Sequence, residues 1–338
     1  MKLWFERGAW ASGRARRVTA AMAREDVKRI AVIRHAALGD MVLVRPFLVE
    51  ARKFFPNAEI VLSLVSNYTY GAPTELADSV HILHGHDQKK TPLKERIMRA
   101  KELGEVDILF DLANTTRSRY LCLLTRAKLK IGFPYRWYLR HLLLDAAVDR
   151  SDFSFEAITM LDALMLFGAN PQMPPNFAWP ESLVDPQTRL SQPRVIYFPF
   201  ASVDSKCWPT ERFGALIDQA ARQYPDYQHV VLAGVGAHEQ TQDFEALASQ
   251  HANVCLQASM SLEDTMRFIA QSKLVVSNDT GIRNLAISLQ TSTLGIFFST
   301  VPYRYWPRYG SHEAVFNPQG DIPGVQDVLD SLARMMAK

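Results

Sequence analysis

Two acidic residues stand where an apolar run gives way to polar turn formers, and the first lies in "VVSNDTGIRNLAI" (275–287). Here Asp279, Thr280 and Gly281 precede a helical pattern. The first N–H groups of a helix lack internal partners and favour anions, and a glycine lets a phosphate approach the backbone. The stretch is therefore a candidate phosphate site. It is equally open that Asp279 only caps the helix, which would stabilise it by about 1 kcal/mol.

The second acidic residue lies in "VIRHAALGDMVLVRP" (32–46). The pattern predicts a strand that ends near His35, and it places Gly39 and Asp40 just before an apolar helix. From this stretch alone, N-capping is the favoured role of Asp40. The functional alternative is a carboxylate that faces a cleft and acts as a general base.

Lys206 lies in a polar loop of "FPFASVDSKCWPTERF" (198–213), before Pro209, which is typical of a first helical turn. It could project into a cleft beside a phosphate, or it could be an ordinary solvated lysine.

In "LAGVGAHEQ" (232–240), Glu239 follows two glycines that lack the G-x-G-x-x-G spacing of a dinucleotide site. Four arginines of the first half follow predicted strands and could form an anion-binding patch or lie on an ordinary surface: Arg117, Arg119, Arg136 and Arg140.

Short apolar runs rich in β-formers alternate with helical patterns along the chain. Ten of these runs are predicted strands, at 29–35, 59–65, 80–84, 107–112, 129–133, 194–199, 229–234, 253–257, 273–278 and 293–298. Several are apolar almost throughout, as expected for a parallel sheet covered on both faces. The alternation predicts α/β architecture with doubly wound sheets. A proline-rich linker at 168–194 indicates two such domains, 29–180 and 181–338, that face each other across a cleft lined by strand ends.

Composition narrows the class of protein. A chain of 338 residues that is 48% hydrophobic can bury two cores, and a net charge of +3 is too mild to indicate nucleic acid. Three scattered cysteines favour a reducing, cytoplasmic setting, and no apolar run approaches the ~18 residues of a spanning helix. Residues 1–28 mix aromatic and basic residues without the apolar centre of a signal peptide. Three possibilities are open for them: an amphipathic helix that lies peripherally on the cytoplasmic face of an anionic inner membrane, a helix that packs on the protein, or a frayed terminus.

Six motifs in this order and spacing resemble the family 9 glycosyltransferases, which include the ADP-heptose:lipopolysaccharide heptosyltransferases. They are Gly39-Asp40, "RSR" at 117–119, "SKCWP" at 205–209, "GVGAHE" at 234–239, "MSLED" at 260–264 and "VVSNDTG" at 275–281. The resemblance covers most of the chain from about Arg29 onward. It implies the GT-B fold, in which two Rossmann-like domains hold the active site between them.

The resemblance implies an inverting transfer of a sugar, expected to be heptose, from a nucleotide-diphospho-sugar, expected to be ADP-heptose. The implied acceptor is an anionic glycolipid, the lipopolysaccharide core or a related envelope glycan. By motif position, Asp40 would be the general base, and Lys206 would neutralise charge on the departing diphosphate. The other implied donor-binding residues are Ser202, Glu239 at the ribose, Met260 against adenine, Asp279 near the sugar, Thr280 and Gly281 at the phosphates, and Asn284. The implied acceptor-binding residues are His35, Arg117, Arg119, Arg136 and Arg140.

The sequence has no D-x-D motif, so neither a metal nor another cofactor is expected. It departs from the family pattern at Asn284, where a histidine is usual, and at "FFST" (297–300), where F-G-P is usual. Both differences lie in the expected donor pocket and bear on the choice of sugar and nucleotide. Two other functions stay open, a non-catalytic protein that binds nucleotide sugars and a GT-B epimerase of nucleotide sugars. A dehydrogenase is disfavoured because the dinucleotide fingerprint is missing.

Overall fold

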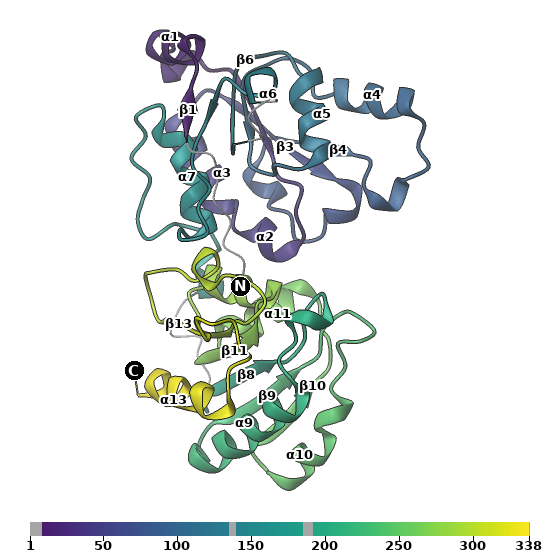
Figure 1. Cartoon of the computed structure of the whole chain (residues 1–338), viewed down its shortest axis with the longest axis vertical. Helices are drawn as coiled ribbons and strands as arrows, with labels where there is room; N and C mark the ends of the chain where they lie inside the picture. The colour runs from purple at the N-terminus through teal and green to yellow at the C-terminus, as the bar shows by residue number, and fades with distance from the viewer. Residues whose placement is uncertain (1–8, 135–139, 185–191, 338) are drawn as a thin grey trace. The chain divides into compact units, whose positions relative to one another are not determined.

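The computed structural model describes residues 9–134, 140–184 and 192–337 (Figure 1). The chain divides into two compact units, and the boundary between them falls between Ala178 and Trp179. Each unit is built around one sheet with helices on both faces. This confirms the predicted α/β class with two doubly wound, largely parallel sheets.

The first unit contains a seven-stranded sheet in the order β1-β7-β6-β5-β2-β3-β4. Its strands are parallel except for β1, which is antiparallel to β7. The strands are β1 (Trp10–Ala11), β2 (Arg29–Ile33), β3 (Glu59–Val65), β4 (Ser79–Leu83), β5 (Val106–Asp111), β6 (Ala127–Gly132) and β7 (Ala146–Ala147).

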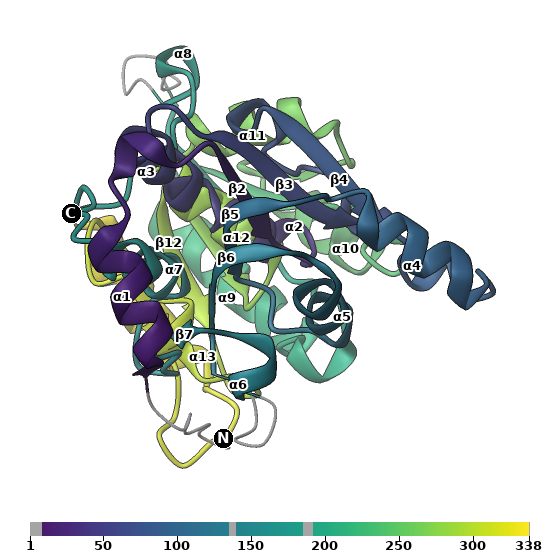
Figure 2. The ribbon, with the colours of Figure 1, turned by 90° about the horizontal axis from the view of Figure 1, so that it is seen from above.

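Helices cover both faces of this sheet (Figure 2). They are α1 (Gly13–Ala21), α2 (Leu38–Val42), α3 (Arg45–Phe54), α4 (Leu93–Lys101), α5 (Thr116–Leu124), α6 (Arg140–Leu143) and α7 (Glu156–Met165), with short 3-10 turns η1 (Arg24–Asp26), η2 (Ser66–Tyr68), η3 (Thr74–Leu76) and η4 (His86–Gln88). Strand alternation explains the two layers. Leu109 of β5 packs with Leu121 of α5, whereas the next residue, Phe110, contacts Phe47 of α3 on the other face.

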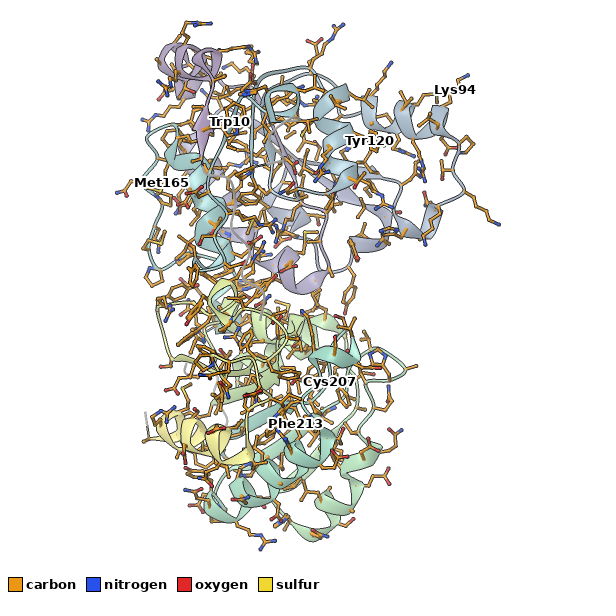
Figure 3. All side chains as sticks on the ribbon, in the orientation of Figure 1. Trp10, Lys94, Tyr120, Met165, Cys207 and Phe213 are labelled. Carbon is orange, nitrogen blue, oxygen red and sulfur yellow. The ribbon has the colours of Figure 1, made fainter. Side chains whose placement is uncertain are left out.

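The second unit contains a six-stranded, all-parallel sheet in the order β10-β9-β8-β11-β12-β13. The strands are β8 (Arg194–Phe198), β9 (Gln228–Leu232), β10 (Val254–Gln257), β11 (Leu274–Asn278), β12 (Ser292–Ile296) and β13 (His312–Val315). The helices are α8 (Glu181–Val184), α9 (Thr210–Gln223), α10 (Glu245–Gln250), α11 (Leu262–Ala270), α12 (Gly281–Ser288) and α13 (Val325–Met336), with 3-10 turns η6 (Asp204–Lys206), η7 (Gln242–Phe244) and η8 (Pro302–Arg304). Trp208 and Phe213 join the core that the strands form with α9 and α13. Figure 3 labels Phe213 in the second unit.

All ten predicted strands are confirmed to within two residues at each end. The strands β1, β7 and β13 were not predicted. The first two contain two residues each, too few to show a period, and β13 carries His312 and Glu313 among its four residues.

The described part of the N-terminal segment belongs to the fold of the first unit. Trp10–Ala11 pairs with Ala146–Ala147, and Ser12 caps α1 through the N–H of Ala15 at 3.0 Å. Packing on the protein was one of the three possibilities open for this segment. Within residues 9–134, 140–184 and 192–337, none of the helices is long and apolar enough to cross a membrane.

Candidate functional site

The strand order of each sheet reverses beside the first long strand of its unit. In the first unit β2 lies between β3 and β5, and in the second unit β8 lies between β9 and β11. Ligands of open α/β sheets bind outside the carboxyl ends of the strands at such a switch point. The loops that leave these strand ends carry most of the residues that the sequence singled out, among them Asp40, Arg117, Lys206 and Asp279.

A buried asparagine holds the loop of Lys206 at the switch point of the second unit. Asn278 ends β11 and is fully buried. Its side-chain oxygen accepts from the Trp208 N–H at 3.0 Å, and its amide donates to the Pro199 carbonyl at 2.8 Å. The indole N–H of buried Trp208 donates to the Pro323 carbonyl at 2.9 Å. These bonds anchor the loop on both sides of Lys206. Sequence reasoning missed this role of Asn278, although a polar amide that ends a buried strand is a usable signal.

Lys206 forms an ion pair with Asp279. The ammonium lies 2.9 Å from Oδ2 of Asp279, and the side chains are 28% and 9% exposed. The Thr300 hydroxyl donates to the same oxygen at 2.8 Å. An ammonium has three N–H donors, so Lys206 can hold Asp279 and still donate to a ligand. Thr300 was not singled out as a site residue, although it ends the "FFST" stretch that departs from the family pattern.

The N-cap of α12 is not Asp279, which was one of the two roles open for that residue. Thr280 is the N-cap residue, with φ −140° and ψ 167°, and its side chain makes no cap hydrogen bond. Because the Asp279 carboxylate bonds to Lys206 and Thr300, the alternative in which Asp279 only caps this helix is wrong. Gly281 is the first helical residue. Backbone N–H donors beside a lysine are what a diphosphate requires.

The interior of α12 carries a buried cation that sequence reasoning missed. Arg283 is fully buried, donates to the Tyr305 carbonyl and lies 5.0 Å from the ring centroid of Phe297. Burial lowers the pKa of Arg283 to about 10, and the nearby Asp279 carboxylate opposes this shift, so the guanidinium stays charged at neutral pH. A Cβ at residue 295 would lie 2.3 Å from Nε of Arg283, which explains the glycine there. Asp279 therefore experiences two cations, Lys206 and Arg283.

The neighbouring Asn284 is only 4% exposed. Its backbone N–H donates to the Thr280 carbonyl at 3.4 Å, in the first turn of the helix. Asp279, Thr280 and Gly281 are all partly exposed. Asn284, which was expected in the donor pocket, is therefore more deeply buried than these three residues.

The glycines of "GVGAHE" let Glu239 fold back over its own loop. Oε2 of Glu239 accepts from the Gly236 N–H at 2.9 Å, and the Glu239 carbonyl accepts from the Gly234 N–H at 2.8 Å. A Cβ at residue 234 would lie 2.1 Å from Oε2, so a side chain there would displace the carboxylate. Nε2 of His238 lies 3.3 Å from the Ala201 carbonyl, which brings the loops after β8 and β9 together.

The two remaining donor candidates also lie on loops at the carboxyl edge of the second sheet. Ser202 is exposed in the loop after β8. Met260 is partly exposed, follows β10 and precedes Ser261, the N-cap of α11. Because all strands of this sheet are parallel, every donor residue implied by the resemblance lies on a segment that leaves the same edge.

In the first unit, Asp40 is the third residue of α2, whose N-cap is Ala37. The N-cap prediction for Asp40 was therefore wrong, because the helix starts three residues earlier than the sequence pattern suggested. The Asp40 side chain is free of that role and partly exposed. Its backbone carbonyl accepts from Nε and Nη2 of Arg34 at 3.2 and 2.9 Å, so a buried arginine fixes the helical turn that carries it.

Arg34 belongs to a buried charge network that sequence reasoning missed. Its Nη1 donates to the Leu112 carbonyl at 2.6 Å and lies 3.3 Å from Oε1 of Glu156, the first residue of α7. Arg150 donates to the same oxygen at 2.7 Å. Two cations and several carbonyls thus compensate the charges, as burial requires. The network joins the end of β2, the turn of Asp40, the end of β5 and α7.

His35 follows β2, and its side chain contacts the loop after β5 at the switch point of the first sheet. Its Nδ1 lies 3.3 Å from Oγ1 of Thr115, the N-cap of α5, and the residue is 7% exposed. Burial, together with the nearby His81, Arg117 and Arg34, lowers the pKa of His35 to about 3. The imidazole is therefore neutral at physiological pH, and it could meet an acceptor only as a neutral hydrogen-bonding group.

Two of the four arginines expected at the acceptor have described side chains, and these two lie on different sides of α5. Arg117 donates to the His84 carbonyl at 3.0 Å and lies 3.3 Å from Nε2 of His86, so it ties α5 to the loop after β4. Arg119 is two residues further along the helix and points to another side, since only residues three or four apart share a face. Arg136 lies outside the described residues. Arg140 begins α6, and its side chain lies outside the description too.

Across the described parts of the chain, no group of three or more His, Cys, Asp or Glu side chains could hold a metal ion.

The sequence model of "Glycosyltransferase family 9 (heptosyltransferase)" matches residues 96–327, which is more than half of the chain. The chain belongs to this family. The resemblance inferred from the motifs is thereby confirmed, and the protein is a glycosyltransferase of the heptosyltransferase family. No curated protein sequence matches the chain.

Solved structures of this family share the fold. The Escherichia coli heptosyltransferase WaaC with ADP-2-deoxy-2-fluoro heptose has a TM-score of 0.69 at 18% identity, over 91% of this chain and 99% of that one. The E. coli ADP-heptose lps heptosyltransferase II has a TM-score of 0.65 at 19% identity, over 91% and 98%. UDP-GlcNAc 2-epimerase from Neisseria meningitidis bound to UDP-GlcNAc is more distant, with a TM-score of 0.52 at 14% identity, over 91% of each chain. These likenesses confirm the GT-B fold of the family 9 chain.

Proposed function

We propose that this family 9 glycosyltransferase transfers heptose from ADP-heptose, with inversion, to an anionic glycolipid acceptor of the lipopolysaccharide core type. The observation that carries the proposal is the Lys206–Asp279 pair at the switch point of the second unit, beside the start of α12, where the Thr280 side chain makes no cap hydrogen bond. Two similar structures add support, since one holds an ADP-heptose analogue and the other is named for ADP-heptose and lipopolysaccharide.

On the donor side, the bond between the anomeric carbon and the diphosphate breaks, and ADP leaves with the bonding electrons. Negative charge on the phosphate oxygens grows toward the transition state. Lys206 and the first N–H groups of α12 then stabilise the transition state more than the bound donor. Asp279, which also accepts a hydrogen bond from Thr300, holds the ammonium in place. Glu239, Met260 and Ser202 would bind the nucleoside.

On the acceptor side, the Asp40 carboxylate takes the proton of the attacking hydroxyl. The hydroxyl oxygen forms the new glycosidic bond on the face opposite the leaving diphosphate, which inverts the anomeric centre. General-base catalysis needs the carboxylate at hydrogen-bond distance from the proton that it takes. Arg34 serves this need by fixing the turn of Asp40, and Arg117 would contact an anionic group of the acceptor.

The proposed reaction uses no divalent metal, because Lys206 and the helix start supply the positive charge. Transfer should therefore proceed at an undiminished rate in EDTA. Loss of activity on chelation that Mg²⁺ or Mn²⁺ restores would contradict this part of the proposal. The proposed setting is the cytoplasmic side of the inner membrane, where a nucleotide sugar and a lipid-borne acceptor can meet.

One incubation tests the whole proposal. The full chain is mixed with ADP-heptose and lipopolysaccharide truncated at the inner core, and ADP release, acceptor mass and anomeric NMR couplings are recorded. We expect ADP release that depends on the acceptor and a product of inverted configuration. ADP release without an acceptor, isomerisation of a nucleotide sugar, or donor binding without any turnover would each overturn it.

A further inference from the structure

The helices α4, α5 and α6 of the first unit expose large apolar side chains. α4 contacts α5, α5 contacts α6, and all three lie on one side of the unit (Figure 2). Leu93 is 71% exposed, Leu142 64% and Tyr120 61%. We name as the α4–α6 surface the exposed residues Leu93, Met98, Tyr120, Leu123, Leu124 and Leu142.

The helix α5 carries apolar side chains both on the side that packs on the sheet and on the side that faces away from it. Leu121 and Cys122 are buried against the sheet. Leu123 and Leu124 lie three and four residues after Tyr120, so both flank it on the face that points away from the core. A helix that only covers a sheet needs one apolar face, and the outward one requires another explanation.

The segment that leads into this surface is strongly basic. Residues 86–101 contain six lysines and arginines and only two acidic residues. These two acids have other partners, since Asp87 accepts from Ser66 at 2.6 Å and Glu95 lies 3.5 Å from His84. Lys89 and Lys90 are exposed in the loop before α4, and Lys94 lies in its first turn. Figure 3 shows Lys94 and Tyr120 on the same side of the first unit, away from Met165.

We propose that the α4–α6 surface docks on an anionic lipid bilayer. Leucine, methionine and tyrosine side chains can enter the boundary of head groups and acyl chains while lysines remain at the anionic head groups. A protein partner fits less well, because lysine is depleted in protein–protein interfaces. A second copy of the chain would set like charges against each other.

The docking surface borders the residues expected at the acceptor. Arg117 lies on α5, and its guanidinium donates to the His84 carbonyl at the start of the basic segment. A bilayer bound here would present a lipid-borne acceptor next to Arg117, and this consequence rests on the proposed function. The docking itself does not, since it is measured without donor or acceptor.

The test is co-sedimentation of the full chain with sucrose-loaded vesicles of phosphatidylcholine and phosphatidylglycerol at a ratio of about seven to three, a strongly anionic surface. We expect binding to these vesicles, weaker binding in high salt and little binding to pure phosphatidylcholine. The variant Lys89→Gln/Lys90→Gln should bind about twentyfold more weakly, since each basic residue near an anionic surface contributes about a fivefold factor. Its matched control is Arg16→Gln/Arg17→Gln, which removes two adjacent exposed cations from α1.

The apolar contribution is tested with Leu93→Ser/Tyr120→Ser, which should weaken vesicle binding at least tenfold. Met165→Ser/Leu166→Ser is the matched control, because these exposed apolar residues lie at the end of α7. Thermal unfolding checks that all variants fold. Transfer to a water-soluble acceptor fragment should be the same in every variant, so a docking failure is separable from a failure of catalysis.

Three outcomes would overturn the docking proposal. One is equal binding by wild type and both α4–α6 variants. A second is loss of binding only in the α1 control, which would assign the membrane contact to the N-terminal segment. The third is self-association in sedimentation equilibrium that the Leu93→Ser/Tyr120→Ser variant abolishes, which would make the surface an interface between copies of the chain.

Discussion

Apart from the additional strand β1 of the first unit, the two units have the same order of strands, and both place candidate residues at the switch point of the sheet. The contacts that hold these residues differ between the units. In the first unit, Arg34 and Glu156 are both buried and fix the backbone turn of Asp40. In the second unit, Lys206 and Asp279 are partly exposed and form the candidate site themselves. A buried pair cannot touch a ligand, but it can position a residue that does. An exposed pair can exchange its partner for a substrate. The difference matches the proposed roles of a placed base and an available cation.

The largest effect is expected at Asp40. The variant Asp40→Asn should lower the transfer rate about 10²–10⁴-fold, because an amide cannot take the acceptor's proton. Donor affinity should stay within a few-fold, and Asp87→Asn serves as the control for loss of a carboxylate in the same unit. Single-turnover rates and ADP-heptose titration separate the two effects. An Asp40→Asn protein that keeps more than about a tenth of the wild-type rate would remove Asp40 from the role of base.

Lys206→Ala should come next, with a kcat loss of about 10²-fold and a smaller change in donor affinity, because the charge that Lys206 meets grows toward the transition state. Lys273→Ala, which removes a lysine just before β11, is the matched control. If only KM changes, Lys206 binds the donor in the ground state and does not stabilise the transition state. The second unit would then contribute binding but no catalytic residue to this comparison. Steady-state kinetics with saturating acceptor would show this.

Glu156→Gln probes the buried side of the comparison. Removing one charge from a buried network costs about 3–5 kcal/mol in unfolding free energy, and here Arg150 and Arg34 would be left without their carboxylate. We expect a loss near the lower value, and a lower kcat at unchanged donor affinity because the turn of Asp40 loosens. Glu105→Gln, which breaks the exposed pair with Arg126, should change stability by less than about 0.5 kcal/mol. Denaturant unfolding of the two variants compares them directly, and equal losses would show that burial is not the deciding factor.

A smaller effect concerns acid stability, where the units should behave alike. Burial lowers the pKa of His35 in the first unit and of His312 in the second to about 3. Their unfolded value is about 6.5, so between these pH values the unfolded chain binds a proton that the folded chain does not. Stability is therefore full above about pH 6.5 and falls as the pH drops, by up to about 1.4 kcal/mol per pH unit for each histidine. His35→Gln and His312→Gln should each flatten this slope between pH 6 and pH 4, and an unchanged slope would mean that the imidazole is charged in the fold.

The sequence predicted the strands well because they are long and apolar on both faces, and it predicted the edge at which the candidate residues lie. It did not predict the bonds that hold them. Nothing in the sequence marks Arg34, and only the fold shows that it reaches Asp40, Leu112 and Glu156. Asp40 and Asp279 were both read as possible N-caps because acidic residues before helices usually are. In each case the true N-cap is a different residue, Ala37 or Thr280, and tertiary partners decided the outcome.

The smallest effect is expected at Asn284, where the family usually has a histidine. The residue is 4% exposed, and it lies in the first turn of α12 beside the buried cation Arg283. Burial, the positive end of the helix and a neighbouring guanidinium all disfavour a protonated imidazole. We therefore expect that Asn284→His carries a neutral ring between pH 6 and pH 8 and changes affinity for ADP and ADP-heptose by less than about threefold, about 0.7 kcal/mol. Calorimetric titration of both proteins at the two pH values measures this. Binding of ADP-heptose by the variant that is about tenfold tighter at pH 6 than at pH 8 would show a charged histidine in reach of the donor. Residue 284 would then contact the donor directly. The donor site of the second unit would include the first turn of α12 as well as Lys206 and Asp279.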